Sequence, residues 1–301
     1  MQIKNFEYFV VAAEAQSFTE AAEILFTTQS SISKKIIALE KELGVKLFDR
    51  SRRTAILTPA GECCLQFAKT ILATHGEMVQ SMKNMTAKTT NQLRVTFLPV
   101  ALYYGMLDQL HEFGENNPCV HLRLSEKGLP DILSGLDKGL YEAALLWGQA
   151  IDESKYQTLE LCRDYMVVLL NKDHPLASMK KISIHQLKEE TFLMLGPKTG
   201  TMDLCLRACR NIGAFEPKIF HQSNHIESIV ESVSKNLGIC LMANTPAQSI
   251  QRDRLKIVPL LEKITSSLVL ARLMNRPVTP MGEQLWAFFD EVSKRTDHSR
   301  P

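Results

Sequence analysis

Residues 17–44, SFTEAAEILFTTQSSISKKIIALEKELG, predict two helices joined by a short turn. In the first helix, the Ser17 hydroxyl can accept a hydrogen bond from the backbone N–H of Glu20. The Glu20 side chain can reach back to Ser17, which completes a capping box. The second helix begins at Thr27 or Thr28, because a threonine hydroxyl is a good N-cap. The stretch therefore predicts a helix-turn-helix.

The second of these helices has an apolar side and a polar side. Apolar residues recur at spacings of four, three and four and form the inward stripe: Ile32, Ile36, Leu39 and Leu43. The polar side begins at the N-cap and includes hydroxyls, an amide and lysines: Thr28, Gln29, Ser30, Ser33, Lys34 and Lys41. Such a surface fits a DNA major groove, where glutamine pairs with adenine and lysine reaches guanine or phosphate. An ordinary solvated helix face fits the same pattern equally well.

A short hairpin is predicted after Gly44, which ends the second helix. Residues 45–48 alternate in polarity, residues 49–53 form a charged loop, and residues 54–57 return as a strand. The loop contains Arg50, Arg52 and Arg53. Between positions 34 and 53 there are seven basic and three acidic residues, which indicates a phosphate-binding surface. An arginine-tipped hairpin is typical of the wing of a winged helix, because guanidinium groups fit a narrow minor groove.

Residues 1 to about 61 resemble the DNA-binding domain of LysR-type transcriptional regulators. The resemblance rests on many positions in register: Phe6, Phe9, Ala13, Glu14, Ser17, Phe18, Thr19, Ala21, Ala22, Gln29, Ser33, Ile36, Leu39, Glu40, Leu43, Gly44, Leu47, Phe48, Arg50, Leu57, Thr58, Ala60 and Gly61. The chain has Ser30 where the family commonly has proline, and Lys34 where it commonly has arginine. Because lysine lacks a bidentate fork, we expect looser base preference at position 34.

A long helix is predicted from Thr58 and Pro59 onward. Two neighbouring apolar stripes give this helix a broad apolar face, which needs a partner because the rest of the segment is too short to bury it. It resembles the family's linker helix, which implies pairing across a dimer. We therefore expect a DNA-binding domain over residues 1–58, a linker helix over 59–90 and an effector-binding domain over 91–301.

From Leu93 onward, short apolar runs alternate with helical stretches, which predicts βαβ units and a largely parallel sheet. The expected architecture is α/β with two lobes, lobe I comprising residues 91–161 and 268–301, and lobe II residues 162–267. This half resembles the family's periplasmic-binding-protein-like effector domain, including residues 173–176 and 236–239. The resemblance implies that a small-molecule effector binds between the lobes, as do crevice ligands at the carboxyl ends of strands.

Carried onto this chain, the resemblance yields a set of candidate effector-binding residues: Val100, Ala101, Gly128, Trp147, Lys198, Gly200, Thr201, Ser223 and Asn224. Many relatives place a hydroxyl just after the first strand to hold a carboxylate, but this chain has an apolar run there, residues 98–101. We therefore expect a less polar effector than usual, or one held mainly by lobe II through Lys198, Thr201 and Asn224.

Other functions find little support in the sequence. An enzyme is the first alternative, since residues 196–201 superficially resemble a phosphate loop, but no lysine follows Gly200. A transport receptor is a second alternative, but a protein of that class would lack the arginine-tipped wing that this sequence predicts. The seven cysteines include no pair or array with zinc spacing, so we expect neither a metal nor another cofactor. Cys205 and Cys209 lie one turn apart on a predicted helix, which raises the alternative of a redox switch. Against this alternative, an intact helix holds the two sulfurs away from good disulfide geometry.

The expected function is therefore that of a transcriptional regulator and not of an enzyme. Its expected partners are double-stranded promoter DNA, a small-molecule effector and RNA polymerase, the last from the family resemblance alone. We also expect a homodimer or homotetramer in the cytoplasm, since no stretch is apolar enough for a membrane span and the N-terminus lacks the apolar core of a signal peptide.

Overall fold

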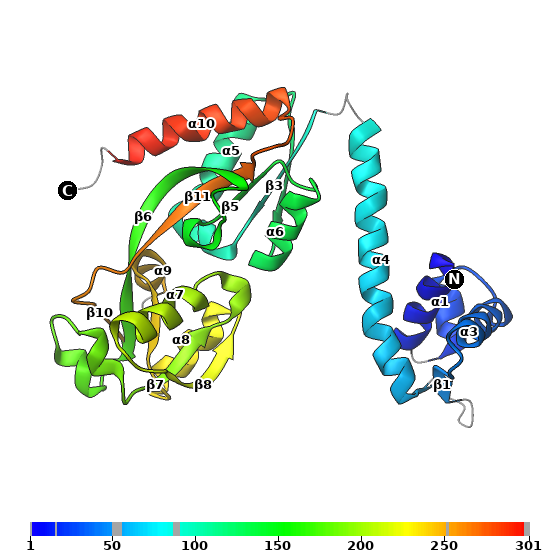
Figure 1. Cartoon of the computed structure of the whole chain (residues 1–301), viewed down its shortest axis with the longest axis horizontal. Helices are drawn as coiled ribbons and strands as arrows, with labels where there is room; N and C mark the ends of the chain where they lie inside the picture. Colours follow the sequence, from blue (N-terminus) through cyan, green and yellow to red (C-terminus); the bar gives the residue numbers. More distant parts are fainter. Residues whose placement is uncertain (1, 16, 50–55, 87–90, 251–252, 298–301) are drawn as a thin grey trace. The chain divides into compact units, whose positions relative to one another are not determined.

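Two units make up the chain, residues 1–88 and residues 89–301 (Figure 1). The computed structural model describes the following residues: 2–15, 17–49, 56–86, 91–250 and 253–297. Among these residues, no helix is both long and apolar enough to cross a membrane.

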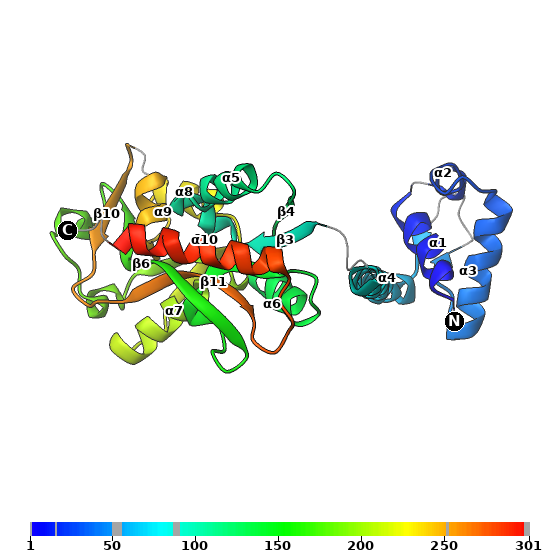
Figure 2. The ribbon, with the colours of Figure 1, turned by 90° about the horizontal axis from the view of Figure 1, so that it is seen from above.

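The N-terminal unit begins with three helices that surround a small core (Figure 2). They are α1 (Ile3–Glu14), α2 (Phe18–Ile24) and α3 (Gln29–Leu43). Three of the four residues of the predicted inward stripe of α3 are fully buried: Ile32, Ile36 and Leu39. The fourth, Leu43, is 37% exposed, because it lies in the last turn of the helix, beyond the core.

The predicted helix ends are confirmed by their hydrogen bonds. The Ser17 hydroxyl accepts from the Glu20 backbone N–H at 3.1 Å. At the start of α3, the N-cap is Thr28, whose hydroxyl accepts from the Ser31 N–H at 3.3 Å. Gly44 ends α3 with φ of +71°, a left-handed conformation that favours glycine.

A two-stranded hairpin and a long helix complete this unit. Strands β1 (Phe48–Asp49) and β2 (Ile56–Leu57) pair antiparallel, as expected of a wing, and α4 spans Pro59–Thr86. Ala68 of α4 is buried in the helix-turn-helix core, whereas Phe67 and Met78 are 66% and 53% exposed. Helix α4 therefore docks on α1 by one side and leaves large apolar side chains uncovered on another.

The first half of the C-terminal unit is built on three parallel strands. They are β3 (Gln92–Phe97), β4 (His121–Glu126) and β5 (Ala143–Trp147), with β3 in the middle. Strand β11 (Thr265–Leu273) pairs antiparallel with β5 and with the first part of β6 (Tyr156–Asn171). The helices of this half are α5 (Met106–Asn116), α6 (Leu129–Asp137) and α10 (Pro280–Asp297), and α10 packs along β6 (Figures 1 and 2).

The second half continues from the same long strand. From Met166 onward β6 leaves β11 and pairs with β9 (Cys240–Ala243) and β10 (Leu255–Pro259). Strands β7 (Thr191–Leu195) and β8 (Lys218–Ser223) pair in parallel, and an isolated bridge joins β7 to the residue before β9. The helices of this half are α7 (Met202–Arg207), α8 (Ile226–Ser234) and α9 (Asn244–Ser249).

Short helices fill several of the connections: η1 (Pro99–Tyr104), η2 (Gly148–Ala150), η3 (Pro175–Ser178), η4 (Ile184–Leu187), η5 (Pro197–Thr199) and η6 (Ala208–Ile212). The first of these follows β3 directly and the fifth follows β7. Both therefore lie just beyond the carboxyl ends of parallel strands.

The expectation of a largely parallel sheet is wrong, because the sheet is mixed. Only the β3–β4, β3–β5 and β7–β8 pairs are parallel among the described strands, and all pairings of β6 and β11 are antiparallel. The long strand β6 runs from one half of the unit into the other (Figure 1), and β11 returns against it. The chain crosses between the halves on these two strands, which must run in opposite directions.

Candidate functional site

The polar side of α3 is exposed over its first two turns. Thr28, Gln29, Ser30 and Lys34 are exposed, and Ser33 is half-buried. The five DNA-contacting residues predicted at α3 and its N-cap thus lie together at the start of the helix. The Thr28 hydroxyl caps the helix and lies 3.0 Å from the Ser30 hydroxyl, so its position is fixed by the helix end.

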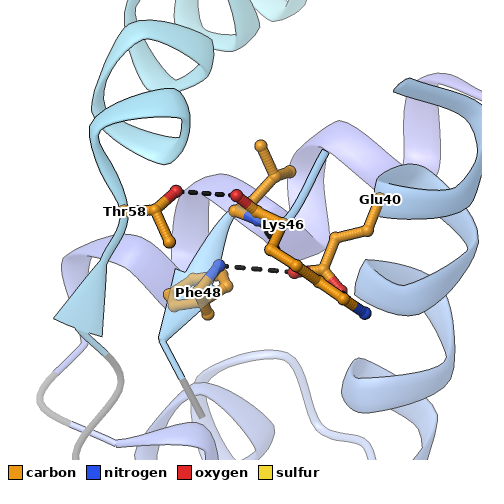
Figure 3. A network of polar contacts seen from close by, with 5 residues as sticks. Glu40, Lys46, Phe48 and Thr58 are labelled. Atoms are coloured by element: carbon orange, nitrogen blue, oxygen red, sulfur yellow. Dashed lines mark hydrogen bonds and ion pairs between the residues drawn. The ribbon is translucent and has the colours of Figure 1, made fainter. Parts of the chain in front are cut away.

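A buried carboxylate at the other end of α3 holds the first strand of the hairpin (Figure 3). One oxygen of Glu40 accepts from the backbone N–H groups of Leu47 at 2.8 Å and Phe48 at 3.3 Å. Its second oxygen lies 3.5 Å from the Lys46 ammonium. Glu40 is only 3% exposed. The signal for this role is present in the sequence, since position 40 follows Ile36 by four residues and so falls on the apolar side.

The start of α4 closes the same network. The Thr58 hydroxyl donates to the Lys46 carbonyl at 2.7 Å and accepts from the Gly61 N–H at 3.0 Å. A Cβ on Gly61 would lie 2.1 Å from the Leu47 carbonyl oxygen, so only glycine permits this approach. The hairpin is thereby fixed to α3 on one side and α4 on the other. The three arginines predicted at its tip, Arg50, Arg52 and Arg53, lie outside the described residues.

A pocket of about 240 Å³ lies in the C-terminal unit, at the carboxyl ends of strands β4, β5 and β7. Its walls come from segments far apart in the sequence, including η1, the start of α8, and the junction of β9 with α9. It is lined by the following residues: Pro99, Val100, Leu102, Tyr103, Glu126, Trp147, Leu195, Thr199, Thr201, Asn224, His225, Ile226, Glu227, Met242, Ala243 and Pro246.

The structure brings four of the nine predicted effector-binding residues to this pocket: Val100, Trp147, Thr201 and Asn224. The other five are not among its lining residues: Ala101, Gly128, Lys198, Gly200 and Ser223. Ala101 is instead buried in the core. The Lys198 stem packs against Gly128, where a Cβ would lie 3.0 Å from that of Lys198.

Several lining residues are not among those predicted from the sequence. Tyr103 comes from η1, Glu126 ends β4, and His225 and Glu227 flank the first residue of α8. Tyr103 lies two residues after Ala101 and Glu126 two residues before Gly128, so both are close in sequence to residues predicted to line the crevice. His225 and Glu227 lie one and three residues after the predicted residue Asn224.

A second buried carboxylate lies where the two halves of the C-terminal unit meet. Asp164 of β6 is 5% exposed. It accepts from the Tyr104 hydroxyl at 2.6 Å and from the backbone N–H of Thr245 at 2.8 Å. Burial, together with this hydrogen bond, raises the pKa of Tyr104 far above its ordinary value. Since η1 and the β9–α9 junction both line the pocket, Asp164 joins two of its walls.

The cysteines weighed as a redox pair are buried thiols. Cys205 lies at 4% exposure in α7, and Cys209 is fully buried in η6. Burial raises the pKa of both, that of Cys209 to about 11. Since the thiolate is the reactive form, both are poor nucleophiles at neutral pH. Within the described residues, no group of three or more His, Cys, Asp or Glu side chains is placed to hold a metal ion.

Two family models match the chain and together span most of it. The model described as bacterial regulatory helix-turn-helix protein, lysR family, matches residues 3–62. The model described as LysR substrate binding domain matches residues 86–294.

Named relatives and solved structures match over nearly the whole length. The chain is 30% identical to the HTH-type transcriptional regulator BenM of Acinetobacter baylyi over 282 residues, 91% of each protein. The crystal structure of full-length BenM matches with a TM-score of 0.60 and 25% identity, covering 100% of this chain and 99% of that one. CbnR, a LysR family transcriptional regulator, matches in fold with a TM-score of 0.65 at 16% identity, covering 97% of this chain and 99% of that one.

Proposed function

Because the chain belongs to the LysR-type family of DNA-binding transcriptional regulators with an effector-binding domain, we propose that α3 reads promoter DNA and that the 240 Å³ pocket binds the effector. The observation that supports the first part is the exposed polar surface at the start of α3, on a helix whose other side is buried. Relatives of the chain are named as regulators, and the protein is a regulator and not an enzyme.

In this proposal the DNA-binding residues divide into two groups. Gln29, Ser33 and Lys34 face the base edges in the major groove, where hydrogen bonds discriminate between bases. Thr28 and Ser30 lie at the N-terminus of the helix, beside the phosphates. Arg50, Arg52 and Arg53 bind phosphates or the minor groove beside the helix, and their contribution is mainly electrostatic.

Gel-shift titrations at several salt concentrations test this division. The double substitution of Arg52 and Arg53 by alanine should weaken binding to most sites and flatten the salt dependence by about two counterions. Gln29→Ala should mainly relax sequence preference, because it removes a base contact. An unchanged salt slope in the arginine variant would contradict the assigned roles.

The pocket is proposed as the effector site because it lies at the carboxyl ends of parallel strands and against the start of α8. It is bordered by both halves of the unit, so a bound molecule would alter how they close on each other. The substitution Val100→Trp fills the pocket from η1. It should abolish ligand-dependent change in DNA binding and leave ligand-free DNA binding intact.

The assembly and cellular setting complete the proposal. The exposed apolar side chains of α4 support a homodimer or homotetramer that sets two copies of α3 against successive turns of DNA. Promoter binding implies work in the cytoplasm and an influence on RNA polymerase. Ligand binding would change DNA bending and the access of polymerase.

A further inference from the structure

The charge of the pocket is the feature that the family resemblance did not predict. Two carboxylates line it, that of Glu126 at the end of β4 and that of Glu227 in the first turn of α8. Among the described residues, neither carboxylate forms a hydrogen bond or an ion pair with another side chain. No lysine or arginine is found among the described residues that line the pocket.

Groups that would favour an anion carry less charge or lie elsewhere: the start of α8 and, when protonated, the His225 ring together carry less positive charge than the two carboxylates carry negative charge. The N–H groups at the start of α8 are equivalent to about half a positive charge, which two full negative charges outweigh. Lys198, which the sequence suggested as an anion ligand, does not line the pocket, and its stem packs on Gly128. The negative charge of Glu227 also reaches Tyr103, since burial first and this carboxylate second raise the pKa of the Tyr103 hydroxyl.

The remaining lining residues suit an organic cation better than a bare metal ion. Apolar side chains predominate, among them Val100, Ile226 and Met242. Two aromatic rings, Tyr103 and Trp147, contribute as well, and aromatic faces attract cations. Trp147 is 1% exposed, and its indole N–H has no hydrogen-bond partner among the described residues, so a ligand that also carries an acceptor could satisfy it.

We propose that the effector pocket selects a small organic cation, an ammonium or amidinium group on an apolar body, with Glu126 and Glu227 as the residues that determine this specificity. The proposal rests on the assignment of this pocket as the effector site. It gives part of the apolar run at residues 98–101 a role, because Pro99 and Val100 line the pocket and would cover the body of the ligand while the two carboxylates hold its charge.

The test uses pairs of ligands that match in shape and differ in charge. Isothermal titration of the full chain would compare benzylamine with phenylacetate, 2-phenylethylamine with 3-phenylpropanoate, and butylamine with pentanoate. We expect at least one ammonium compound to bind saturably and at least tenfold more tightly than its carboxylate partner. Glu126→Gln and Glu227→Gln should each weaken that binding about tenfold or more, because each removes a charge-assisted contact.

The matched control is Glu153→Gln, which removes the same charge at an exposed position outside the lining of the pocket and should leave binding unchanged. Tighter binding of a carboxylate than of its paired amine, full affinity in both pocket variants, or no binding by any amine would overturn the proposal.

The variant Val100→Trp separates this failure from failure of the proposed effector site. If a carboxylate binds and Val100→Trp abolishes its binding, the pocket stands as the effector site and only the cation preference fails. If an amine binds equally well to Val100→Trp, the site itself is elsewhere. Circular dichroism and ligand-free DNA binding verify that each variant is folded.

Discussion

The Glu40 carboxylate holds the first strand of the hairpin in place, although Glu40 is not itself predicted to contact DNA. It bonds two backbone N–H groups of the strand that leads into the arginine-rich loop. Removing it leaves two buried donors without their acceptor. We expect Glu40→Ala to lower the free energy of unfolding by about 2–3 kcal/mol, measured by urea denaturation.

The matched control is Glu23→Ala, an exposed glutamate of α2, which should change stability by less than about 0.5 kcal/mol. Glu40→Gln keeps one oxygen acceptor and should fall between the two. Equal stability of Glu40→Ala and the control would show that the carboxylate does not hold the strand.

Cys209 gives a prediction about alkaline pH. The folded chain raises the pKa of this thiol from 9.0 to about 11, chiefly through burial and then through the charge of Glu216. Between these values the unfolded chain releases a proton that the folded chain retains, so stability falls as pH rises from 9 to 11. Urea denaturation across this range should show a steeper loss in the wild type than in Cys209→Ala. Parallel curves would contradict the assignment.

At the scale of elements, α4 has two sides with different roles. Ala68 faces the helix-turn-helix core, whereas Phe67 and Met78, eleven residues and about three turns apart, share an exposed side. We expect Phe67→Asp to shift the protein toward monomers, because a charge on this side opposes helix pairing. Light scattering after size exclusion measures the change.

Gly76→Asp is the control for that experiment. By helical rotation position 76 lies opposite position 67, and a Cβ there meets nothing within 4 Å. It introduces the same charge and should leave the oligomer intact. Dissociation by both variants, or by neither, would indicate that the exposed side of α4 is not the interface.

Elements differ in how far their sequence predicts them. Helix α3 is predicted from its cap to its terminal glycine, because capping and apolar spacing act within a few residues. The segments at β8, β10 and the first part of β6 were not predicted as strands. The first three residues of β8 are all exposed: Lys218, Ile219 and Phe220. The strand therefore shows no regular alternation of buried and exposed positions.

At the scale of the whole molecule, Asp164 joins the two halves of the C-terminal unit through Tyr104 and the Thr245 N–H. Because this carboxylate is buried, losing a partner is costly. We expect Tyr104→Phe and Asp164→Asn each to lower the free energy of unfolding by about 1.5–3 kcal/mol. The double variant should lose less than the sum, since both changes remove the same hydrogen bond.

Asp173→Asn is the control, as this exposed residue lies on the loop after β6 and should have little effect. Strict additivity in the double variant would show that Tyr104 and Asp164 stabilise the fold independently. A change in ligand affinity in Tyr104→Phe would further indicate that this contact positions η1 against the pocket.

The helix-turn-helix, the hairpin, the long helix and the α/β character of the remainder can all be predicted from the sequence alone. These depend on caps, glycines and periodic apolar residues that interact within a few positions of one another. The mixed sheet, the buried contacts of Glu40 and Asp164, and the composition of the pocket instead depend on how distant segments pack together. Glu126 and Glu227 lie 101 positions apart in the sequence, and strand direction and chain crossing alone bring them to one cavity. Their proximity results from packing between distant segments, and no local sequence pattern predicts it.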